Sequence, residues 1–468
     1  MKRIVIAGGG IAGLSVAFAL RKKAPAAEIL LLERAPRVGG NIRTEESEGY
    51  LCEAGPNGFL DNAPDTWRLI RDLNLEPRVF SSSDTARRRF IVRAERLREV
   101  PTSPQSLLTT SAVSSRAKLR MAMEPFARRR IDDDESIYDF ATRRVGREAA
   151  EMLVGSMVSG MFAGDSRALS LRACFPRMQQ MEDQHGSLVR ALLAKRRRGT
   201  GAATGLPAGR LTSFTGGMAE LIGALTAALG ASVRTSTAVR MLWPQGATSH
   251  RGEYAVATSS GAIQASAVVL ASPAADSAAL VRGFDSRLAD LLSGIPSAPL
   301  AVVCLGYPAS TIEKTCSLSG FGFLVPRPEP FRILGAVWES SVYGNRAPSG
   351  HALLRVMIGG ALDRGAVALS DGQLLAIVRR DLRGIMGLAE RPEFVRIIRH
   401  TRGIPQYVTG HLARLREIDT RLHAAPGLFL AGNSYRALSM NACIAEAHGI
   451  ADAVLNHVNR QQHALSLV

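Results

Sequence analysis

The chain opens with an apolar run, a cluster of glycines and a second apolar stretch. Residues 4–7 form a short run rich in Ile and Val, and Gly8, Gly10 and Gly13 follow it. Apolar residues then recur at helical spacing from Leu14 to Leu20. This order predicts a buried strand, a tight turn and a helix.

Later stretches alternate between the two hydrophobic periodicities. Helical spacing recurs over residues 65–73, 117–126, 218–229 and 444–455. Strand-like apolar runs lie at residues 28–32, 87–92, 233–239, 268–273, 300–305, 353–358 and 426–433. We therefore predict an α/β fold with an α+β portion. The run at 268–273 ends in a turn typical of a chain returning to a nucleotide-binding sheet, so we expect the domain that holds this sheet to be discontinuous.

The glycines point to a dinucleotide site. Gly8 can form the turn, Gly10 has no Cβ to block a pyrophosphate, and Gly13 lets strand and helix pack closely. The helix N-terminus offers free N–H groups to the phosphates. Glu33, twenty residues after Gly13, can accept the hydroxyls of an adenosine ribose and disfavours a 2′-phosphate. A secretory segment is a poor alternative, because the apolar stretch is short and its glycines are patterned.

The next motif narrows the cofactor. The run Arg34-Ala35-Pro36-Arg37-Val38-Gly39-Gly40-Asn41-Ile42-Arg43-Thr44 resembles the second motif of the flavoprotein family of amine oxidases, phytoene desaturases and protoporphyrinogen oxidases. The resemblance implies FAD rather than NAD. Residues 53–58 match a further flavin-contacting turn of that family. The apolar strand at 426–433 leads through Gly432 toward a helix, and we expect such an element to bring a third backbone segment to the same cofactor. The cofactor-binding residues that we expect are Gly8, Gly9, Gly10, Ile11, Ala12, Gly13, Glu33, Arg34, Gly39, Gly40, Asn41, Gly55, Pro56, Asn57, Gly58, Val239, Gly432, Leu438, Ser439 and Met440.

Further matches are specific to the porphyrinogen oxidases of this family. They follow the family's order along nearly the whole chain, at residues 89–90, 162–170, 320–326, 357–360, 403–411 and 441–444. The resemblance implies that Arg89 binds a propionate and that an apolar slot around the tetrapyrrole contains Gly160, Phe321, Leu324 and Met357. An apolar dianion needs such walls and a cationic anchor. Phe321 and Met357 as plain core residues, and Arg89 as a surface arginine, are the alternatives.

The implied reaction is a six-electron oxidation of protoporphyrinogen IX, with O2 as acceptor and H2O2 as product, as a step of haem synthesis. The flavin would carry the chemistry, so no catalytic side chain and no metal site are expected. Coproporphyrinogen III is the first alternative substrate. A flavin amine oxidase is the second alternative, although Tyr435 alone stands near Gly432 where an aromatic cage would be needed.

Charge adds a second feature. The 468-residue chain carries a formal net charge of +17, and twelve Lys or Arg lie between Arg87 and Arg130. Nucleic acid, an anionic lipid surface, a polyanionic substrate or a merely solvated face could each explain this excess. Nucleic acid is not expected, because only Phe90 and Phe126 are interleaved as stacking groups. The basic amphipathic stretch 117–126 suits a lipid surface, or a helix that covers its own core.

Five cysteines without C-x-x-C spacing argue against disulfides and zinc, and favour a cytoplasmic protein. We expect no transmembrane helix, and a peripheral position on the inner face of the cell membrane and a homodimer stay open.

The expected domains are an FAD-binding domain in three parts, 1–80, 214–284 and 401–468, a helical basic part at 81–213 that faces substrate and membrane, and a substrate-binding part at 285–400. The chain departs from its family at Ala437 and Ser439, where most relatives have small, glycine-type residues. If the backbone still approaches the flavin there, Ala437 must have negative φ.

Overall fold

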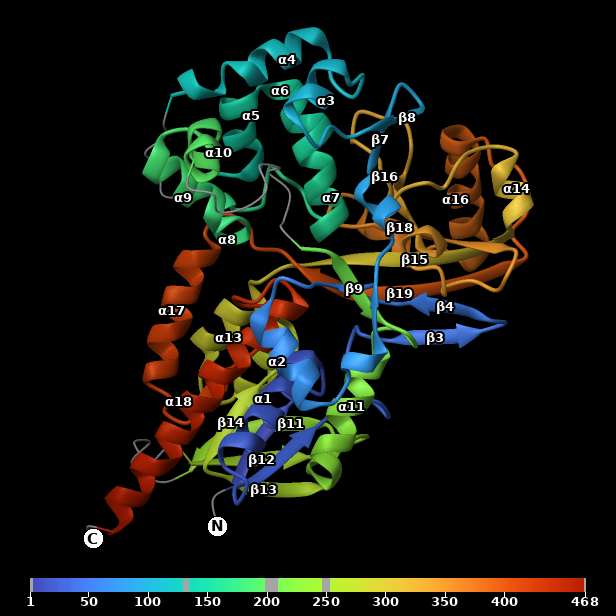
Figure 1. The fold of residues 1–468 in the computed structure, drawn as a ribbon. Helices are drawn as coiled ribbons and strands as arrows, with labels where there is room; N and C mark the ends of the chain where they lie inside the picture. Colours follow the sequence, from blue (N-terminus) through green and yellow to red (C-terminus); the bar gives the residue numbers. More distant parts are fainter. Residues whose placement is uncertain (1–2, 129–133, 198–208, 246–252, 467–468) are drawn as a thin grey trace.

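The computed structural model describes residues 3–128, 134–197, 209–245 and 253–466. Figure 1 shows a compact lower part around a parallel sheet, a second large sheet to one side of it, and a group of helices at the top. Within these ranges no helix is both long enough and apolar enough to cross a membrane.

The first sheet has the order β10-β2-β1-β14-β20, and all its neighbouring strands are parallel. Its strands are β1 (Arg3–Ala7), β2 (Glu28–Leu32), β10 (Val233–Arg234), β14 (Ala267–Leu270) and β20 (Leu428–Leu430). They come from the beginning, the middle and the end of the chain, so the Rossmann-like domain is discontinuous, as predicted. Along β1, Ile4 and Ile6 enter one core while Val5 and Ala7 enter another, because successive side chains point to opposite faces of a strand.

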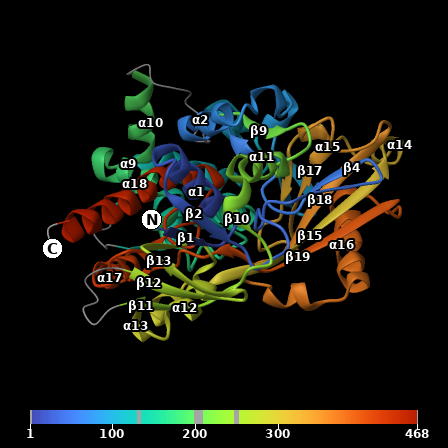
Figure 2. The ribbon, with the colours of Figure 1, turned by 90° about the horizontal axis from the view of Figure 1, so that it is seen from below.

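Helices cover the Ile4 face of this sheet. They are α1 (Ile11–Lys23), α11 (Ala219–Leu229) and α18 (Met440–Ser466), and α1 contacts both of the others (Figure 2). The opposite face packs on an antiparallel sheet of β11 (Val239–Gln245), β12 (Glu253–Thr258) and β13 (Gly261–Ala265), and on α13 (Ser286–Ser293) and α17 (His411–His423). Burial on both faces explains the continuous apolar runs of β1 and β2.

The second sheet has seven strands in the order β19-β15-β18-β17-β16-β7-β8. They are β7 (Phe90–Arg93), β8 (Arg96–Glu99), β15 (Ser297–Pro308), β16 (Gly322–Leu324), β17 (Ile333–Trp338), β18 (His351–Gly359) and β19 (Phe394–Pro405). Helix α16 (Asp371–Met386) packs on one face, against Ala301 and Val303. Val302 and Cys304, which alternate with them, pack against Tyr50 and Cys52 of the N-terminal part. One face of this sheet is therefore turned toward the nucleotide-binding region.

The helices at the top of Figure 1 are held together by buried charge as well as by apolar contacts. Arg144 of α5 (Ile137–Val145) has no exposed side-chain surface, and its guanidinium pairs with Glu124 (3.2 Å) and with Glu182 of α9 (Pro176–His185). Arg143 pairs with the same Glu182 (2.7 Å) and with Glu135. Such pairs fix orientation more than they add stability, since desolvation offsets most of the attraction.

The structure corrects the sequence prediction in several places. The strand expected at 233–239 is split between β10 and β11, and β7 begins only at Phe90. The helix expected at 117–126 ends at Ala122 as α4 (Ser115–Ala122), and a 3₁₀ turn follows at Glu124–Phe126, because Pro125 cannot continue the helix. The C-terminal helix spans Met440–Ser466, well beyond the predicted limits. The stretch of glycines and basic residues at 196–209, which predicts a loop, and the acidic stretch at 132–135, which suits a helix N-terminus, lie partly outside the described residues.

The expected domain limits stay predictions, and the sheets do not follow them. Strands β7 and β8 lie within the range 81–213 that was expected to be helical, yet they pair with the large sheet through β16. Strand β19 crosses the limit at residue 400. Both differences arise from pairing between segments far apart in sequence, which local periodicity does not report.

Candidate cofactor and substrate site

Three glycines shape the turn between β1 and α1, each for a different steric reason. Gly8 has a φ of +115°, which side chains rarely adopt. A Cβ on Gly13 would lie 2.0 Å from the carbonyl oxygen of Gly8, so its absence lets α1 pack on the turn. Among the described residues, a Cβ on Gly10 would meet no atom within 4 Å, and no side chain caps the helix that begins there. An open glycine at an uncapped helix N-terminus suits a pyrophosphate.

Glu33 lies against this turn from the end of β2. One carboxylate oxygen accepts the Gly9 N–H (2.7 Å) and the other accepts the Ala35 N–H (2.9 Å). Both oxygens keep a lone pair for further donors such as ribose hydroxyls. Gly9 itself is enclosed, since a Cβ there would lie 2.8 Å from Val38. Ile11 and Ala12 open α1, so the predicted residues of this motif lie together.

The Gly39-Gly40 pair crosses the same turn. The Gly39 N–H donates to the Gly9 carbonyl (2.7 Å), Gly39 bridges to Gly10, and both residues of the pair have positive φ. Asn41 donates from Nδ2 to the carbonyl of Gly403 (3.2 Å), which joins the motif to β19 of the large sheet. The second motif thus links the nucleotide-binding part to the large sheet.

Two exposed arginines of this motif have different contacts. Arg34 is largely exposed, and its guanidinium pairs with Asp276 (3.3 Å) rather than with the glycine turn. Arg37, which the sequence reasoning missed, donates to the carbonyls of Val38 (3.1 Å) and Gly40 (3.0 Å). Burial, and then the nearby Arg43, lower the pKa of Arg37. Its place in the same motif was an available signal, and we add Arg37 to the cofactor region.

The turn at residues 54–58 rests on a buried charged network. Arg355 of β18 donates to the carbonyls of Glu53 (3.0 Å) and Gly55 (2.5 Å). Glu339 accepts from the Asn57 amide (3.3 Å), and one of its oxygens has no partner among the described residues. These contacts hold the turn from the side of the large sheet. No local pattern along the chain indicates these contacts, because they join residues about 300 positions apart.

Burial governs the acids of this network. It raises the pKa of Glu53 to about 7, although Met218 N–H, Arg346 and Thr44 favour the ionised form. Burial also raises the pKa of the Glu339 carboxyl. Gly55 and Gly58 are closed by protein, since a Cβ on them would lie 2.2 Å from the Asn41 carbonyl and 2.4 Å from the Tyr343 hydroxyl. Pro56, between them, is partly exposed.

The C-terminal segment meets the same region. Gly432 follows β20 with a φ of +110°, and a Cβ there would lie 3.3 Å from the Cβ of Ala12. Ser439 caps α18, because its hydroxyl accepts the Ala442 N–H (3.2 Å). Leu438 instead packs against the core of the upper helices, Met440 is buried beside α1, and Val239 packs on the far face of the parallel sheet. The φ of Ala437 is not positive. This agrees with the condition under which the backbone could still approach the flavin at this residue.

The five predicted substrate residues come together on the large sheet. In its register Leu324 of β16 lies opposite Gly335 of β17, and Gly335 lies opposite Met357 of β18. Phe323, Val356 and Ile358 enter the core under α16, so Leu324 and Met357 face the other way. Gly160 of α7 (Ser156–Phe162) contacts this row, since a Cβ there would lie 2.4 Å from Leu324. We call Gly160, Phe321, Leu324 and Met357 the apolar wall.

Arg89 stands at one end of the apolar wall. The Phe321 N–H donates to the Arg88 carbonyl (2.8 Å), and the Arg89 guanidinium lies 5.4 Å from the centre of the Phe321 ring. Arg87 and Arg88 pair with Asp84 and Glu99, whereas Arg89 forms no ion pair with any residue that the structure describes. Its side chain is exposed, yet surrounding protein lowers its pKa. An accessible cation without a carboxylate partner is suited to an anionic ligand.

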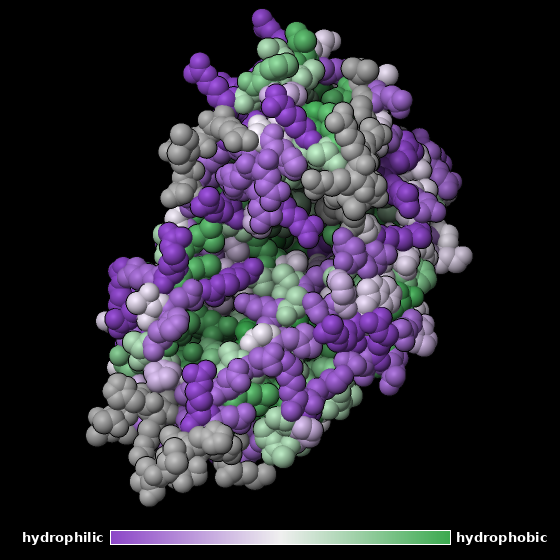
Figure 3. All heavy atoms as spheres, turned by 60° about the vertical axis from the view of Figure 1, so that its left-hand side comes forward, coloured by the Kyte–Doolittle hydropathy of each residue, from purple (hydrophilic) through white to green (hydrophobic). Residues whose placement is uncertain are grey.

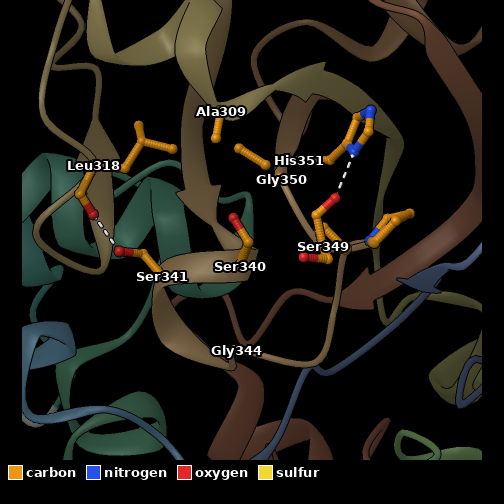
Figure 4. Close-up of a pocket in the computed structure, with 11 residues that line it drawn as sticks. Ala309, Leu318, Ser340, Ser341, Gly344, Ser349, Gly350 and His351 are labelled. Atoms are coloured by element: carbon orange, nitrogen blue, oxygen red, sulfur yellow. Dashed lines mark hydrogen bonds between the residues drawn. The ribbon is translucent and has the colours of Figure 1, made fainter.

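Two other features lie apart from this site. A surface pocket of about 490 Å³ lies near Ser340, Ser349 and His351, and none of the predicted site residues lines it (Figure 4). Its polar groups bond among themselves, as His351 does with the Ser349 carbonyl (3.1 Å). In the described part of the chain, no three His, Cys, Asp or Glu side chains gather as a metal ion would require.

The parallel sheet, the open glycine turn and the carboxylate at its edge define a dinucleotide-binding oxidoreductase. Residues 11–455 match the family described as flavin containing amine oxidoreductase, and the chain belongs to that family. FAD is accordingly its cofactor, and the open space at Gly10 and the uncapped start of α1 fit its pyrophosphate.

The curated relatives cover almost the whole chain. The coproporphyrinogen III oxidase of Bacillus subtilis is 30% identical, with 98% of each chain covered. The chloroplastic protoporphyrinogen oxidase of Oryza sativa is 32% identical, with 97% of this chain and 88% of the relative covered. A solved structure of a candidate protoporphyrinogen oxidase from Exiguobacterium sp. 255-15 has a TM-score of 0.83, with 26% identity and 97% and 98% coverage. A putrescine oxidase variant, at 16% identity and a TM-score of 0.72, shares the fold.

Proposed function

We propose that the chain is an FAD-dependent oxidase of porphyrinogens in haem biosynthesis. Protoporphyrinogen IX would lose six electrons and six hydrogens to three O2, giving protoporphyrin IX and three H2O2. Coproporphyrinogen III, oxidised to coproporphyrin III, is the alternative substrate. The names of the relatives support both, since they include a protoporphyrinogen oxidase and a coproporphyrinogen III oxidase of nearly the full length of this chain.

One observation carries the proposal: at the end of an apolar wall lies an accessible arginine that has no carboxylate partner among the described residues. A porphyrinogen is a broad apolar ring that carries carboxylates at its edge. Phe321, Leu324 and Met357 would contact the ring and exclude water, while Arg89 would bind a propionate. The apolar wall and the Arg89 cation do not suit a small diamine, because its charges are positive.

The side chains would position the substrate rather than react with it. When bound, FAD supplies the two-electron acceptor for each of three rounds. Asn41 and Arg355 join the flavin-side turns to the sheet that carries the apolar wall. This linkage would fix the distance between the ring-binding face and the cofactor, which matters because misplacement by about 1 Å can cost 100-fold in rate.

The test is direct. The purified protein should show a flavin absorption spectrum and should convert a porphyrinogen to the fluorescent porphyrin, with three H2O2 released per ring. Putrescine and cyclohexylamine serve as negative controls for the amine oxidase alternative. A flavin-loaded protein that oxidises an amine and neither porphyrinogen would overturn the proposal.

We also propose that the protein is cytoplasmic and rests on an anionic lipid surface through α4 and the turn after it. Leu119, Met123 and Phe126 are 67%, 51% and 80% exposed. Arg116 and Lys118 lie on the same short helix, and basic groups beside apolar ones suit anionic lipid. At the top of Figure 3, above the hollow in this face of the molecule, apolar and strongly polar residues lie side by side.

Vesicle flotation tests this contact. The protein should float with phosphatidylglycerol vesicles and remain below phosphatidylcholine vesicles, and Phe126→Ser with Leu119→Ser should remain below both. Met241→Ser with Trp243→Ser, which alters two exposed apolar residues elsewhere, is the matched control and should float like the wild type. Equal flotation of all variants would contradict the proposal.

A further inference from the structure

A second arginine lies near the other end of the apolar wall. Arg327 follows β16 after Val325 and Pro326, which are both buried, and its own side chain is exposed. It lies six residues beyond Phe321, which contacts Arg89, and six extended residues span at most about 20 Å. The turn that contains Arg327 is anchored, because the Val325 N–H donates to the Leu334 carbonyl (3.0 Å).

The same turn docks on the far end of β7. The carboxylate of Glu329 accepts the N–H groups of Ala94 (2.9 Å) and Glu95 (3.1 Å), which form the turn between β7 and β8. Strands β7 and β16 run parallel, with Leu324 opposite Ile91. Arg89 precedes this pair of strands and Arg327 follows it, so the two arginines lie at opposite ends of the pair.

The elements that build the apolar wall converge on Arg327. Asp165 lies three residues beyond the end of α7, which carries Gly160, and Asp363 lies four residues beyond the end of β18, which carries Met357. Both carboxylates act on Arg327 electrostatically, although burial has the larger effect and lowers its pKa. Arg327 therefore lies where α7, β16 and β18 end together.

Both neighbouring carboxylates have other partners. Asp363 accepts two hydrogen bonds from Arg332 (2.7 and 3.0 Å), and Asp165 accepts the Arg167 N–H (2.9 Å). Across the described ranges, no carboxylate lies within 4.0 Å of the Arg327 guanidinium nitrogens. Like Arg89, Arg327 is an accessible cation beside the apolar wall, and it forms no ion pair with the part of the chain that the structure describes.

The two porphyrinogens differ in what they present to the two ends of such a site. Protoporphyrinogen IX carries two propionates on adjacent rings and vinyl groups on the other two rings. Coproporphyrinogen III carries a propionate on every ring. When one side of either molecule is held at Arg89, the opposite side presents vinyl groups in the first case and carboxylates in the second.

We propose that Arg327 is a second cationic anchor of the substrate site and that it binds the propionates of coproporphyrinogen III opposite those held at Arg89. This inference rests on the proposed porphyrinogen oxidase function and deepens it. Arg327 would favour the tetracarboxylate, whereas Arg89 would serve both substrates.

The test compares the two ring systems in turnover and in binding. We would measure kcat/KM for both porphyrinogens, and the Kd of coproporphyrin III and protoporphyrin IX from fluorescence, with wild type, Arg327→Ala, Arg327→Lys and Arg89→Ala. Arg282→Ala is the charge-matched control, because Arg282 is exposed and pairs with Asp290 far from the apolar wall. Arg327→Ala should weaken coproporphyrin III binding, and kcat/KM for its porphyrinogen, about tenfold, the effect of one charged contact.

In Arg327→Ala, the Kd of protoporphyrin IX and the kcat/KM for protoporphyrinogen IX should change less than twofold. Arg89→Ala should weaken the binding of both ring systems. Arg327→Lys should recover part of the loss, because the charge is kept and the planar fork is not. Equal effects of Arg327→Ala on both rings, or no effect on either, would overturn the inference. If the wild type oxidises neither porphyrinogen, the proposed function fails, and the binding comparison still decides whether Arg327 selects the tetracarboxylate.

Discussion

The two halves of the site are built in opposite ways. At the cofactor end, recognition relies on backbone groups, and the important property of Gly8, Gly10 and Gly13 is the side chain that they lack. At the substrate end it relies on side chains, as with Arg89 over Phe321 and with Leu324 in register with Met357. Phosphates require closely spaced N–H groups that one turn can supply, whereas a broad ring requires a surface that only several strands can supply.

The largest effect should come from substitutions in the glycine turn, where Gly13 is needed for packing and Gly10 for binding of the cofactor. Gly13→Ala places a Cβ 2.0 Å from the Gly8 carbonyl, so backbone must move, and we expect a loss of about 3 kcal/mol in the free energy of unfolding. Gly10→Ala meets only open space, so the unfolding free energy of the apoprotein should fall by less than about 1 kcal/mol, while flavin retention falls at least tenfold.

Thermal unfolding of the apoproteins and the flavin-to-protein ratio measure the two effects. The comparison breaks if Gly10→Ala retains flavin like the wild type. In that case the open space beside Gly10 does not receive the pyrophosphate.

The second-largest effect should come from Arg89, at the substrate end of the site. Arg89→Ala should raise the KM for porphyrinogen with flavin content intact, since losing a charged contact costs roughly 1.5 to 3 kcal/mol. Arg89→Lys should recover only part, because Lys cannot make a bidentate contact. Steady-state kinetics and flavin absorbance measure both quantities, with Arg87→Ala as the neighbouring control. Unchanged kinetics in Arg89→Ala would mean that another cation binds the propionate.

The same contrast explains what sequence could and could not predict. The glycine turn and Glu33 were predictable because strand, turn, helix and carboxylate follow one another within about thirty residues. The pairing of β7 with β16 was not, because it joins segments about 230 residues apart. The resemblance to a known family supplied Arg89, Phe321 and Leu324, which periodicity alone would have treated as a basic run and core residues.

Two local signals were available and missed. Pro125 already argued against a helix running through residue 126. Ser439, just before a long apolar helical stretch, has the position of an N-cap, and the structure places it there. By contrast, nothing local indicates that Arg355 holds the turn at Gly55, because the side chain crosses between two sheets.

Glu53 belongs to the buried charged network between the cofactor half and the substrate half of the site, and it should make the stability of the protein depend on pH. Glu53 has a pKa of about 7 in the folded state, above the value of 4.5 that applies when it is exposed. Between these values the folded state holds a proton that unfolding releases, so the free energy of unfolding should decrease as pH rises from about 4.5 to 7. Well above pH 7 the carboxyl is ionised in both states and contributes no further change. The decrease due to this group over that range should be roughly 2 to 3 kcal/mol.

Glu53→Gln should flatten this dependence, which urea titrations at pH 5, 6 and 7 would measure. Glu46→Gln, an exposed acid on the neighbouring strand, should keep the wild-type slope. If Glu53→Gln also kept that slope, burial of Glu53 would not control the pH dependence.

The smallest effect should come from the segment where this chain departs from its family. Ala437 is buried in the core beside α1, and Ser439 caps α18, so both side chains have structural contacts. Ala437→Gly with Ser439→Gly should therefore lower the unfolding free energy by about 1 kcal/mol, through a lost methyl group and a weakened cap. Flavin stoichiometry should not change, because Ala437 already has the φ that an L-residue prefers, and porphyrinogen kinetics should change only modestly. Thermal unfolding, flavin absorbance and steady-state kinetics would measure the three. A wild type purified without flavin, together with a double variant that acquires it, would mean that these side chains block the cofactor rather than support the helix that begins beside it.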